Sequence, residues 1–420
     1  MDFIINAKAK SRPGGVLWRY PDFLKLWAGQ TISELGSRIT RDGIPLAAVL
    51  VLGARPSQMG LLTVAGAAPL LLLGLLVGSW VDRLRRRPIM IAADLARAVV
   101  LASIPVAAFA HRLSMLQLYV VIALAGVGTV FFDVAYQTYL PSLVEHENLL
   151  EGNSKLAMSG AAAEIAGPSL TGILVQTITA PIAILFDALS FLVSAVSVAS
   201  IRKREPAPHP GSAAPHPIAG LRFLFGHPLL RAIACYSLTA YFFFGFIGPL
   251  YVLFAVRELG LTPALLGVAI AMGGVGSLIG SSIAPLVRLR FGVGRTFIGA
   301  VLAMVAFYAL IPLAHGSAAA ALLFLIVQQL FGDCAHTTYV INEITLRQRV
   351  APAEVLGRVN AAMQLMTRGM FPAGAAIGGF LGEFVGVRTT LSVAVAGILA
   401  ASFWLIASPL RSWKTGDDAL

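Results

Sequence analysis

Residues 78–88 read GSWVDRLRRRP, a short charged stretch that lies between two long apolar runs. A helix needs about 20 predominantly apolar residues to cross a bilayer, and both flanking runs are long enough. Clustered arginines are not tolerated in the hydrocarbon core, but they are common in the loops at its surface. The stretch therefore predicts a tight loop at a membrane surface, joining two membrane-spanning helices.

The composition of the whole chain agrees with this interpretation. The sequence has 420 residues, of which 57% are hydrophobic and only 12% are charged, whereas about a quarter of the residues in soluble proteins are charged. Helices satisfy their own backbone hydrogen bonds in lipid, so we expect an all-α protein. Twelve spans are predicted, at 24–53, 58–80, 88–110, 115–140, 153–178, 181–201, 229–255, 262–286, 296–314, 318–345, 359–383 and 388–409.

Lysine and arginine placement predicts the orientation of these spans. With the N-terminus in the cytoplasm, four of the 31 basic residues fall in outer loops and four within spans, and the others face the cytoplasm. The outer four are Arg55, Arg112, Arg257 and Arg388, and those within spans are Arg38, Arg41, Arg97 and Arg368. Topology thus explains the net charge of +11, and no nucleic-acid partner is expected. Both termini are predicted to be cytoplasmic in a multi-pass protein of the inner or plasma membrane. No signal peptide is recognised before Asp22, so the first span is expected to act as an uncleaved anchor.

The chain also repeats itself at an offset of 207 residues. Pro56 and Gly60 match Pro263 and Gly267. Glu147, Leu149 and Asn153 match Glu354, Leu356 and Asn360. Gly167 and Gly172 match Gly374 and Gly379. This predicts two pseudo-symmetric six-helix bundles, 1–201 and 229–420, joined by a Pro-rich and charged cytoplasmic linker, 202–228. Within the linker, 218–227 is expected to lie along the inner surface, and we assign the linker no binding role.

The pattern Gly78-x-x-x-Asp82-Arg83-x-x-Arg86-Arg87 resembles the loop between the second and third helices of the major facilitator superfamily, where it is a conformational latch. The resemblance implies that Asp82 accepts hydrogen bonds from the N-terminus of the eleventh span, near Gly357–Asn360. The arginines would bind lipid headgroups or the carboxylates of Asp94, Glu145, Glu147 or Glu151. Arg85 departs from the pattern, since the family usually has glycine there. The alternative is a generic basic loop with one incidental acid.

In the fifth span, Gly167-Pro168-x-x-Thr171-Gly172 resembles the antiporter signature of the superfamily's exporters, with Thr171 in place of a glycine. The alternative is an ordinary packing kink. Nearly the whole chain resembles the drug:proton antiporter branch that includes macrolide, tetracycline and enterobactin exporters. Its signs include FFDVAYQTYLPSLV at 131–144 and GRVNA at 357–361. One element is missing, because Ile122 stands where exporters often carry an arginine.

Ionisable residues within spans are costly and often mark transport pathways or proton relays. The first span carries Glu34, Arg38, Arg41 and Asp42, and the 34/38 and 38/42 spacings place opposite charges one turn apart. We expect this ladder to face a central cavity. The alternative is a paired structural ladder that carries no protons. Glu164, one turn before Pro168, is a second candidate for proton coupling.

Asp333 and His336 in the tenth span share one helix face, and histidine changes charge between pH 5 and 8. They are a candidate proton relay, with a hydrogen-bonded structural pair as the alternative. We expect Asp94, Asp133 and Asp187 to lie nearer span ends and to serve packing or gating. The aromatic run 242–246 is expected to pack or to face lipid.

Together these features predict a secondary transporter that exports an amphipathic small molecule in exchange for protons by alternating access. The alternative is an importer or a lysophospholipid flippase of the same fold. The expected partners are the substrate, protons and membrane lipids, and the chain is expected to be monomeric. No cofactor, metal or catalytic residue is expected, because nucleotide-binding glycine loops, metal-ligand motifs and nucleophile elbows are not recognised. A membrane-embedded enzyme is therefore disfavoured, and a passive channel is disfavoured by the latch.

Overall fold

A computed structural model describes residues 16–81, 83–203, 205 and 217–412 of the chain. These residues are almost entirely helical, and no strand occurs among them. The first six long helices are α1 (Pro21–Leu50), α2 (Pro56–Val81), α3 (Arg86–Phe109), α4 (Met115–Leu143), α5 (Leu149–Ile178) and α6 (Ala180–Ala199). The second six begin with α8 (Pro228–Leu253), α9 (Pro263–Phe291) and α10 (Val293–Tyr308). The next is formed by α12 (Ala318–Val327) together with α13 (Asp333–Val350), and the last two are α14 (Ala353–Val385) and α15 (Val387–Ala401).

Several of the later helices contain a local break. A π-helical turn, Phe254–Glu258, ends α8, and a second one, Gln328–Gly332, joins α12 to α13. Short helices continue α10 and α15, namely α11 (Leu310–Leu313) and α16 (Phe403–Ile406). The span predicted at 318–345 is therefore one continuous helical segment that contains a π-helical turn, and Asp333 follows directly after that turn.

Nine described helical segments are both long and apolar enough to cross a membrane by composition. The other three long helices, α1, α5 and α14, have 30, 30 and 33 residues and carry charged residues along their length. Such helices cannot face lipid on every side, so their charges must face protein or water. The prediction of an all-α membrane protein is confirmed for the described residues.

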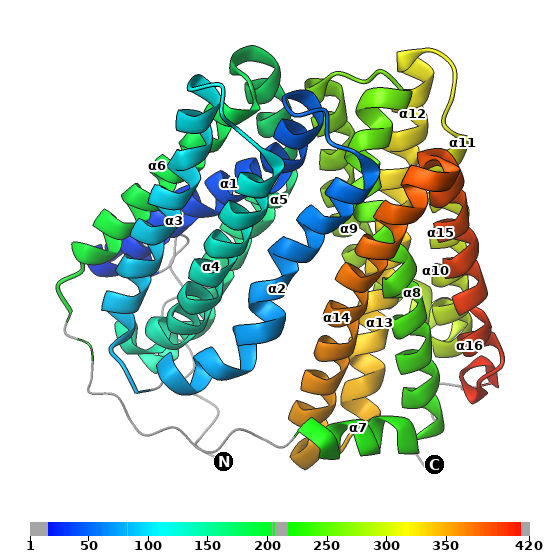
Figure 1. Ribbon diagram of the computed structural model, residues 1–420. Coiled ribbons are helices and arrows are strands. Elements are labelled where there is room, and N and C mark those ends of the chain that lie inside the picture. The colour runs from blue at the N-terminus through cyan, green and yellow to red at the C-terminus, as the bar shows by residue number, and fades with distance from the viewer. Residues whose placement is uncertain (1–15, 82, 204, 206–216, 413–420) are drawn as a thin grey trace, which may run out of the picture.

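The helices pack mainly within two groups (Figure 1). In the first group α1 packs against α5 and α6, α3 against α4 and α6, and α2 against α4. In the second, α8 packs against α14 and α15, while α13 packs against α9 and α10. The contacts between the groups are made chiefly by α5 with α9 and by α2 with α14. The residue boundaries of the two bundles and of the linker stay a prediction.

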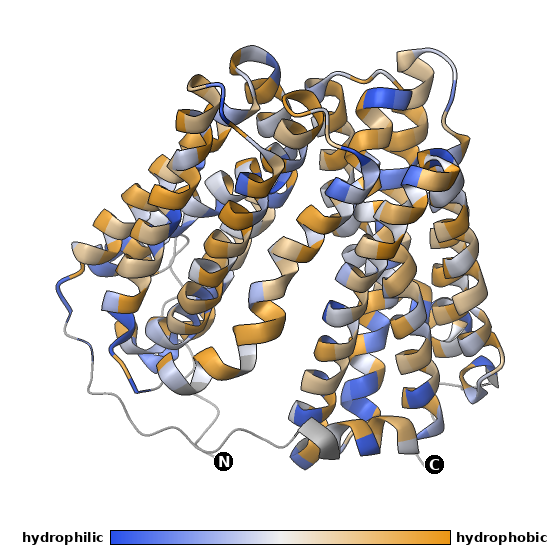
Figure 2. Cartoon of the chain, in the orientation of Figure 1, coloured by the Kyte–Doolittle hydropathy of each residue, from blue (hydrophilic) through white to orange (hydrophobic). Residues whose placement is uncertain are grey.

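The described loops and helix ends at one end of the molecule carry more basic residues than those at the other. We call the end that carries Arg86, Arg202, Arg288 and Arg347 the basic end, and the end that carries Arg55, Arg112, Arg257 and Arg388 the outer-loop end. The short helix α7 (Pro217–Gly226) lies across the basic end, beside α8 and α14, in agreement with the predicted surface helix (Figure 1). Apolar residues cover much of the helix lengths, and hydrophilic residues gather toward the loops (Figure 2).

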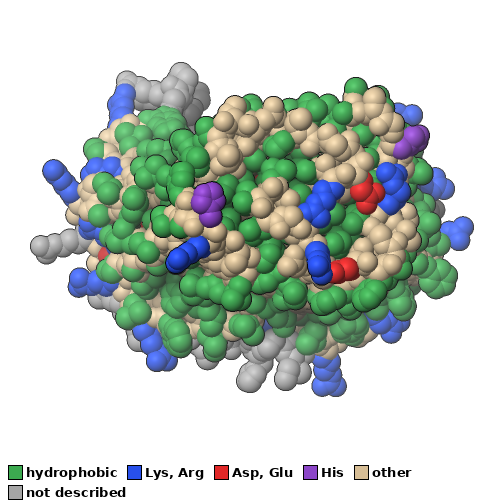
Figure 3. Space-filling view, turned by 45° about the horizontal axis from the view of Figure 1, so that its top comes forward, with side chains coloured by type: hydrophobic (Ala, Val, Ile, Leu, Met, Phe, Trp, Pro, Cys, Tyr) green, Lys and Arg blue, Asp and Glu red, His purple; other side chains and the backbone are tan. Residues whose placement is uncertain are grey.

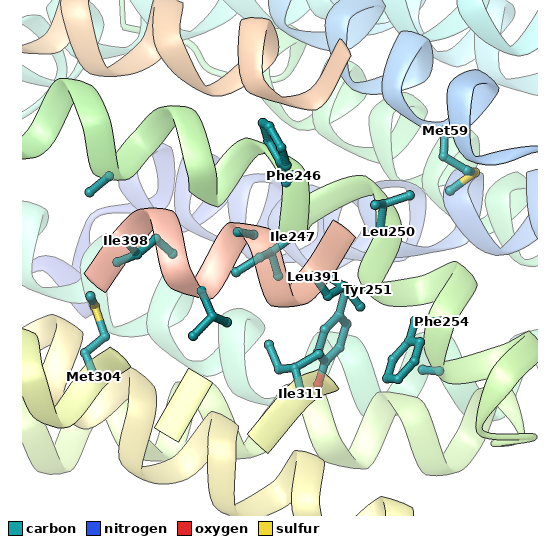
Figure 4. Close-up of a cluster of buried hydrophobic side chains, with 14 of the residues drawn as sticks. Met59, Phe246, Ile247, Leu250, Tyr251, Phe254, Met304, Ile311, Leu391 and Ile398 are labelled. Atoms are coloured by element: carbon teal, nitrogen blue, oxygen red, sulfur yellow. The ribbon is translucent and has the colours of Figure 1, made fainter. Parts of the chain in front are cut away.

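The aromatic run of α8 belongs to the protein interior. Phe246 is 3% exposed and lies against Gly378 of α14, while the ring of Phe243 lies against Gly397 of α15. Small residues on the neighbouring helices thus make room for large rings, which is how close helix packing is achieved in membranes. The core continues through Leu250 and Tyr251 to Met59 of α2 (Figure 4).

Candidate functional site

The two groups of helices are joined by two seams built from small residues. In the first seam Gly267 of α9 lies against the backbone oxygen of Pro168 in α5, and Gly172 lies against that of Pro263. In the second, Gly60 of α2 lies against the backbone oxygen of Ala375 in α14. A side chain at these glycines would meet backbone atoms, so the close approach requires glycine.

Polar contacts close the outer-loop end beside these seams. Arg55 forms an ion pair with Glu383 of α14 at 3.7 Å, and the Ala264 backbone N–H donates to Gln176 Oε1 of α5 at 3.2 Å. The acidic side chains visible on this face lie beside basic ones (Figure 3). From this end, the ribbons of α2 and α14 diverge toward the basic end (Figure 1).

A chamber of about 550 Å³ lies between the two groups. Its walls are mainly apolar and come from both groups, for example Met59 and Leu62 of α2 and Ile247 of α8. Its polar lining comprises Arg41, Asp42, Thr63, Tyr251, Tyr308, Gln328 and Gln329. The hydroxyl of Tyr251 and Oε1 of Gln328 are buried, and neither has a partner at good hydrogen-bond geometry among the described residues. Such groups favour a ligand that supplies hydrogen bonds, because an unpaired buried polar atom costs about 1–3 kcal/mol.

Asp333 lies beside this chamber, and its hydrogen-bond partner is a tyrosine and not His336. Its Oδ1 accepts a hydrogen bond of 3.0 Å from the Tyr308 hydroxyl of α10. His336 instead contacts the ring of Phe244 in α8, with ring centroids 5.8 Å apart. The two side chains share a helix face, yet the structure describes no contact between them. The tyrosine partner comes from another helix, so sequence spacing along the tenth span could not reveal it.

The charged residues of the first span line the chamber and a second cavity that adjoins it, and the alternative, a ladder paired within the helix, is not formed. Arg38 forms its ion pair with Glu164 of α5, and Arg41 lies 3.6 Å from the same carboxylate. The described residues provide no ion-pair partner for Glu34 or Asp42. Opposite charges one turn apart can pair, but a carboxylate on a neighbouring helix competes successfully here. Glu164 therefore ties α5 to α1, and Asp42 is left to line the chamber.

The predicted antiporter-like residues lie together on the face of α5 that meets α1 and α9. Gly167 lies against the side chain of Arg38, whose Cγ would be 2.9 Å from a Cβ at this position. Thr171, which replaces a glycine of the family pattern, is fully buried and donates to the Gly167 carbonyl at 2.8 Å. The substitution is accommodated because its hydroxyl bonds within its own helix.

A second cavity, of about 430 Å³, lies between α1, α3 and α4. We call it the side cavity. Its charged lining residues are Glu34, Arg38, Arg41, Arg97 and Asp133. Arg41 also lines the chamber, so the two spaces adjoin. The sequence places Arg97 within a span, and a charge at that depth is a signal of function that the sequence analysis did not use.

The prediction that Asp94, Asp133 and Asp187 lie nearer the span ends is also wrong in part. Asp187 lies near the middle of α6 and is 1% exposed, while Asp94 is fully buried against Arg97. Asp133 of α4 lies at the side cavity. These residues therefore surround the bundle interior and do not mark its ends.

The predicted latch loop is described except at one residue. Asp82 lies outside the described residues. Gly78 has open space around the position of a Cβ, and Arg83 is exposed. Arg86 pairs with Glu205 at 3.5 Å, not with the acids proposed from the sequence, and Arg87 donates to the Ala199 carbonyl.

The start of the linker is held to the first bundle by hydrogen bonds. The carboxylate of Glu205 accepts from the backbone N–H groups of Arg86 and Arg87 at 2.7 and 3.2 Å. It therefore caps the N-terminus of α3, where free N–H groups favour a negative charge. Asp22 similarly accepts from the backbone N–H groups of Arg202 and Lys203.

Two helical groups that meet at one end around a shared chamber define a membrane transporter fold. A profile of the Major Facilitator Superfamily matches residues 26–374, and the chain belongs to this family. It is a transporter and not an enzyme.

Relatives and solved structures agree with this assignment. The uncharacterised MFS-type transporter YfiS of Bacillus subtilis is 27% identical, with 91% of each chain covered. The multidrug efflux pump Tap of Mycolicibacterium fortuitum is 26% identical over 89% of this chain and 91% of that protein. A bacterial homologue of the iron transporter ferroportin, in an inward-facing state, shares the fold with a TM-score of 0.77 and 20% identity, covering 95% of this chain and all of that one. The nucleoside transporter NupG superposes with a TM-score of 0.71 at 12% identity, over 94% of this chain and all of that one.

Proposed function

We propose that this protein exports amphipathic small molecules in exchange for protons by alternating access. The observation that carries the proposal is the chamber shared by the two helical groups. It combines apolar walls with a few polar groups, the usual composition of a site for a drug-sized ligand. Similarity to a multidrug efflux pump, and over 43% of this chain to macrolide efflux protein A of Streptococcus pyogenes, supports export.

The basic end is proposed to face the cytoplasm, together with both termini, because basic loops remain on that side of a membrane. The described conformation is then closed toward the outside. Asp82 would act in the opposite conformation by docking at the N-terminus of α14. The N-cap residue there, Pro352, makes no side-chain capping bond, so N–H groups remain for an incoming carboxylate.

The proton-coupling candidates are Glu34, Asp42, Glu164, Asp333 and His336, with Arg38 as a partner. The positions of Asp42 in the chamber and of Asp333 beside it support a link between substrate and protons. An ionised acid in a membrane interior is costly, and taking up a proton removes that cost.

The test is uptake of radiolabelled erythromycin into inverted membrane vesicles with an imposed proton gradient. We expect uptake that stops when a protonophore collapses the gradient, and a large loss in Asp333→Asn. The matched control is Glu147→Gln, which neutralises an exposed carboxylate at the basic end and should transport normally. Export that continues without a gradient would overturn the antiport mechanism.

The same vesicles test direction. Flux from the interior of inverted vesicles to the medium would instead indicate an importer. Vesicles loaded with fluorescent lysophospholipid test the flippase alternative, which requires movement between leaflets that depends on this protein and on Asp42.

A further inference from the structure

A groove of about 420 Å³ lies on the second helical group and shares no lining residue with the chamber or the side cavity. Its walls come from α9, α10 and α13, which belong to segments long and apolar enough to cross a membrane. A tight turn at Gly292 joins α9 to α10, but the two helices make few contacts with each other, and each packs closely against α13. The groove therefore lies between α9 and α10, and α13 forms its floor. We call it the α9–α10 groove.

The α9–α10 groove opens toward the surface that lipid covers. Phe291 lines one end and is 53% exposed, and Phe331 lines the other end and is 47% exposed. Exposed phenylalanines within spans meet acyl chains, which are as apolar as the side chains themselves. A lipid chain can therefore enter this groove from the side.

The length of the groove matches one leaflet of a bilayer. Arg295 in the first turn of α10 and Phe307 in its last turn both line the groove. Twelve residues separate them, which corresponds to about 18 Å along a helix. Half of the hydrocarbon core of a bilayer is about 15 Å thick. The stacked rings of Phe307 and Phe331, with centroids 5.3 Å apart, lie at the deep end.

The charge in the groove is confined to its end at the membrane surface. Arg295 is exposed, and it is the only charged residue among the described lining residues. The hydroxyls of Thr296 and Thr338 both donate to backbone carbonyls, so neither is available to donate to a ligand. The groove thus combines a cation at the surface with apolar walls along its depth, which is the polarity of a phospholipid in reverse order of charge.

Positive charge exceeds negative charge at this end of the groove. Arg288 and Arg290 lie in the last turn of α9, just before the turn that leads to Arg295. The described residues provide no ion-pair partner for any of these three arginines. Basic residues at a membrane surface attract lipids with a net negative headgroup more strongly than zwitterionic lipids.

We propose that the α9–α10 groove is a binding site for one anionic phospholipid of the leaflet at the basic end. The lipid phosphate accepts hydrogen bonds from the Arg295 guanidinium. One acyl chain lies between α9 and α10 and extends as far as Phe307 and Phe331. The lipid thereby fills the space that the two helices leave between them. The inference does not depend on the direction or the energy source of transport, because none of these residues lines the chamber.

The test is photo-crosslinking with phosphatidylglycerol that carries a diazirine at the end of one acyl chain. The full chain is placed in nanodiscs of phosphatidylcholine that contain this photoreactive lipid, and crosslinked peptides are identified by mass spectrometry. We expect crosslinks concentrated around Phe307 and Phe331. Phosphatidylcholine with the same diazirine should give roughly fivefold fewer of them, a factor typical of one basic residue that acts on an anionic lipid.

Arg295→Gln should reduce the crosslinks from phosphatidylglycerol to the level of phosphatidylcholine. Arg295 is exposed, so this substitution removes no buried group that folding requires. The matched control is Arg349→Gln, an exposed arginine in the last turn of α13 that does not line the groove and should leave the preference intact.

A second pair of variants tests the acyl chain. Ala303→Phe fills the groove and should lower the crosslinks from both lipids around Phe307 and Phe331. Ala306→Phe, at an exposed position of α10 outside the groove, should not lower them. If Ala303→Phe does not fold, the comparison of Arg295→Gln with Arg349→Gln still decides the inference.

Equal crosslinking by the two lipids in the unsubstituted protein would overturn the inference, because the groove would then hold only the lipids that surround any span. An unchanged preference in Arg295→Gln would also overturn it. Loss of the crosslinks on addition of inorganic phosphate would instead indicate a site for a free anion, and loss on addition of erythromycin would indicate a second drug site. Either result would exclude a phospholipid site.

Discussion

Gly379 of α14 lies so close to Gly60 of α2 that a Cβ on Gly379 would be 2.9 Å from the Gly60 Cα. The 207-residue repeat gives this contact a counterpart. Gly172 lies against the backbone oxygen of Pro263, as Gly379 lies against that of Pro56. The residues that repeat at this offset therefore form both seams. Each seam takes one copy of the repeat from each bundle, as the pseudo-symmetry of the two bundles requires.

We predict that Gly60→Val forces this seam apart and favours a conformation that is open at the outer-loop end. Overpacking against backbone typically costs about 1–3 kcal/mol, which corresponds to a roughly five- to 150-fold change in the ratio of two conformations. The measurement is labelling of a Thr63→Cys reporter in the chamber by an impermeant thiol reagent, with Cys235→Ser and Cys334→Ser. Labelling from the outer side should become faster.

The matched control is Gly299→Val in α10, because a Cβ at Gly299 meets no atom within 4 Å. Its labelling rate should equal that of the protein without the substitution. Equal rates for Gly60→Val and Gly299→Val would show that the seam does not hold the outer-loop end closed.

A second prediction concerns the cap on α3. Glu205→Gln removes the negative charge that accepts from the N–H groups of Arg86 and Arg87. A negative charge at a helix N-terminus stabilises by about 0.3–1 kcal/mol, so we expect a melting temperature in detergent that is about 1–2 °C lower. Glu147→Gln, an exposed carboxylate at the same end, is the control. An unchanged melting temperature for Glu205→Gln would mean that the cap contributes nothing to stability.

The fold was predictable from the sequence because its signals are local. Apolar run lengths, loop arginines and the 207-residue offset each depend on a single segment or a single comparison. The pairing of charges was not predictable, because residue spacing along one helix gives no information about a partner on another helix. Glu164 thus displaced Glu34 and Asp42 as the partner of Arg38, and Tyr308 took the place expected of His336. Glu205 was missed because it lies in a segment whose composition resembles a plain linker.

A third prediction is a pH effect at Asp22, in the first turn of α1 and just before the predicted first span. Burial raises the pKa of this carboxyl, but hydrogen bonds from Lys25 and from the N–H groups of Arg202 and Lys203 outweigh it and hold the pKa below its ordinary value of 3.8. A lowered pKa stabilises the folded protein above about pH 3.8, and the stabilisation is lost as the pH falls through the folded value. Asp22→Asn should therefore lower the melting temperature at pH 7, with a smaller difference at pH 3.5. A difference that is constant from pH 7 to pH 3.5 would exclude this role.

The fourth prediction tests the ion pair between α1 and α5 with a double-mutant cycle. The side chain of Arg38 is 18% exposed and that of Glu164 is 48% exposed. Glu164→Gln leaves a mostly buried guanidinium without its partner, so we expect a loss of about 1–2 kcal/mol in the free energy of unfolding. Arg38→Met should cost less, because Glu164 remains partly in water and lies 3.6 Å from Arg41.

The double variant, Arg38→Met with Glu164→Gln, should be about as stable as Arg38→Met alone, since it leaves no buried charge unpaired. The measurement is unfolding in detergent followed by tryptophan fluorescence, with the coupling energy taken from the four proteins. Additive losses would show that the two side chains do not depend on each other. In that case Gly167, which lies against the stem of Arg38, would hold the arginine in place by packing and not by charge.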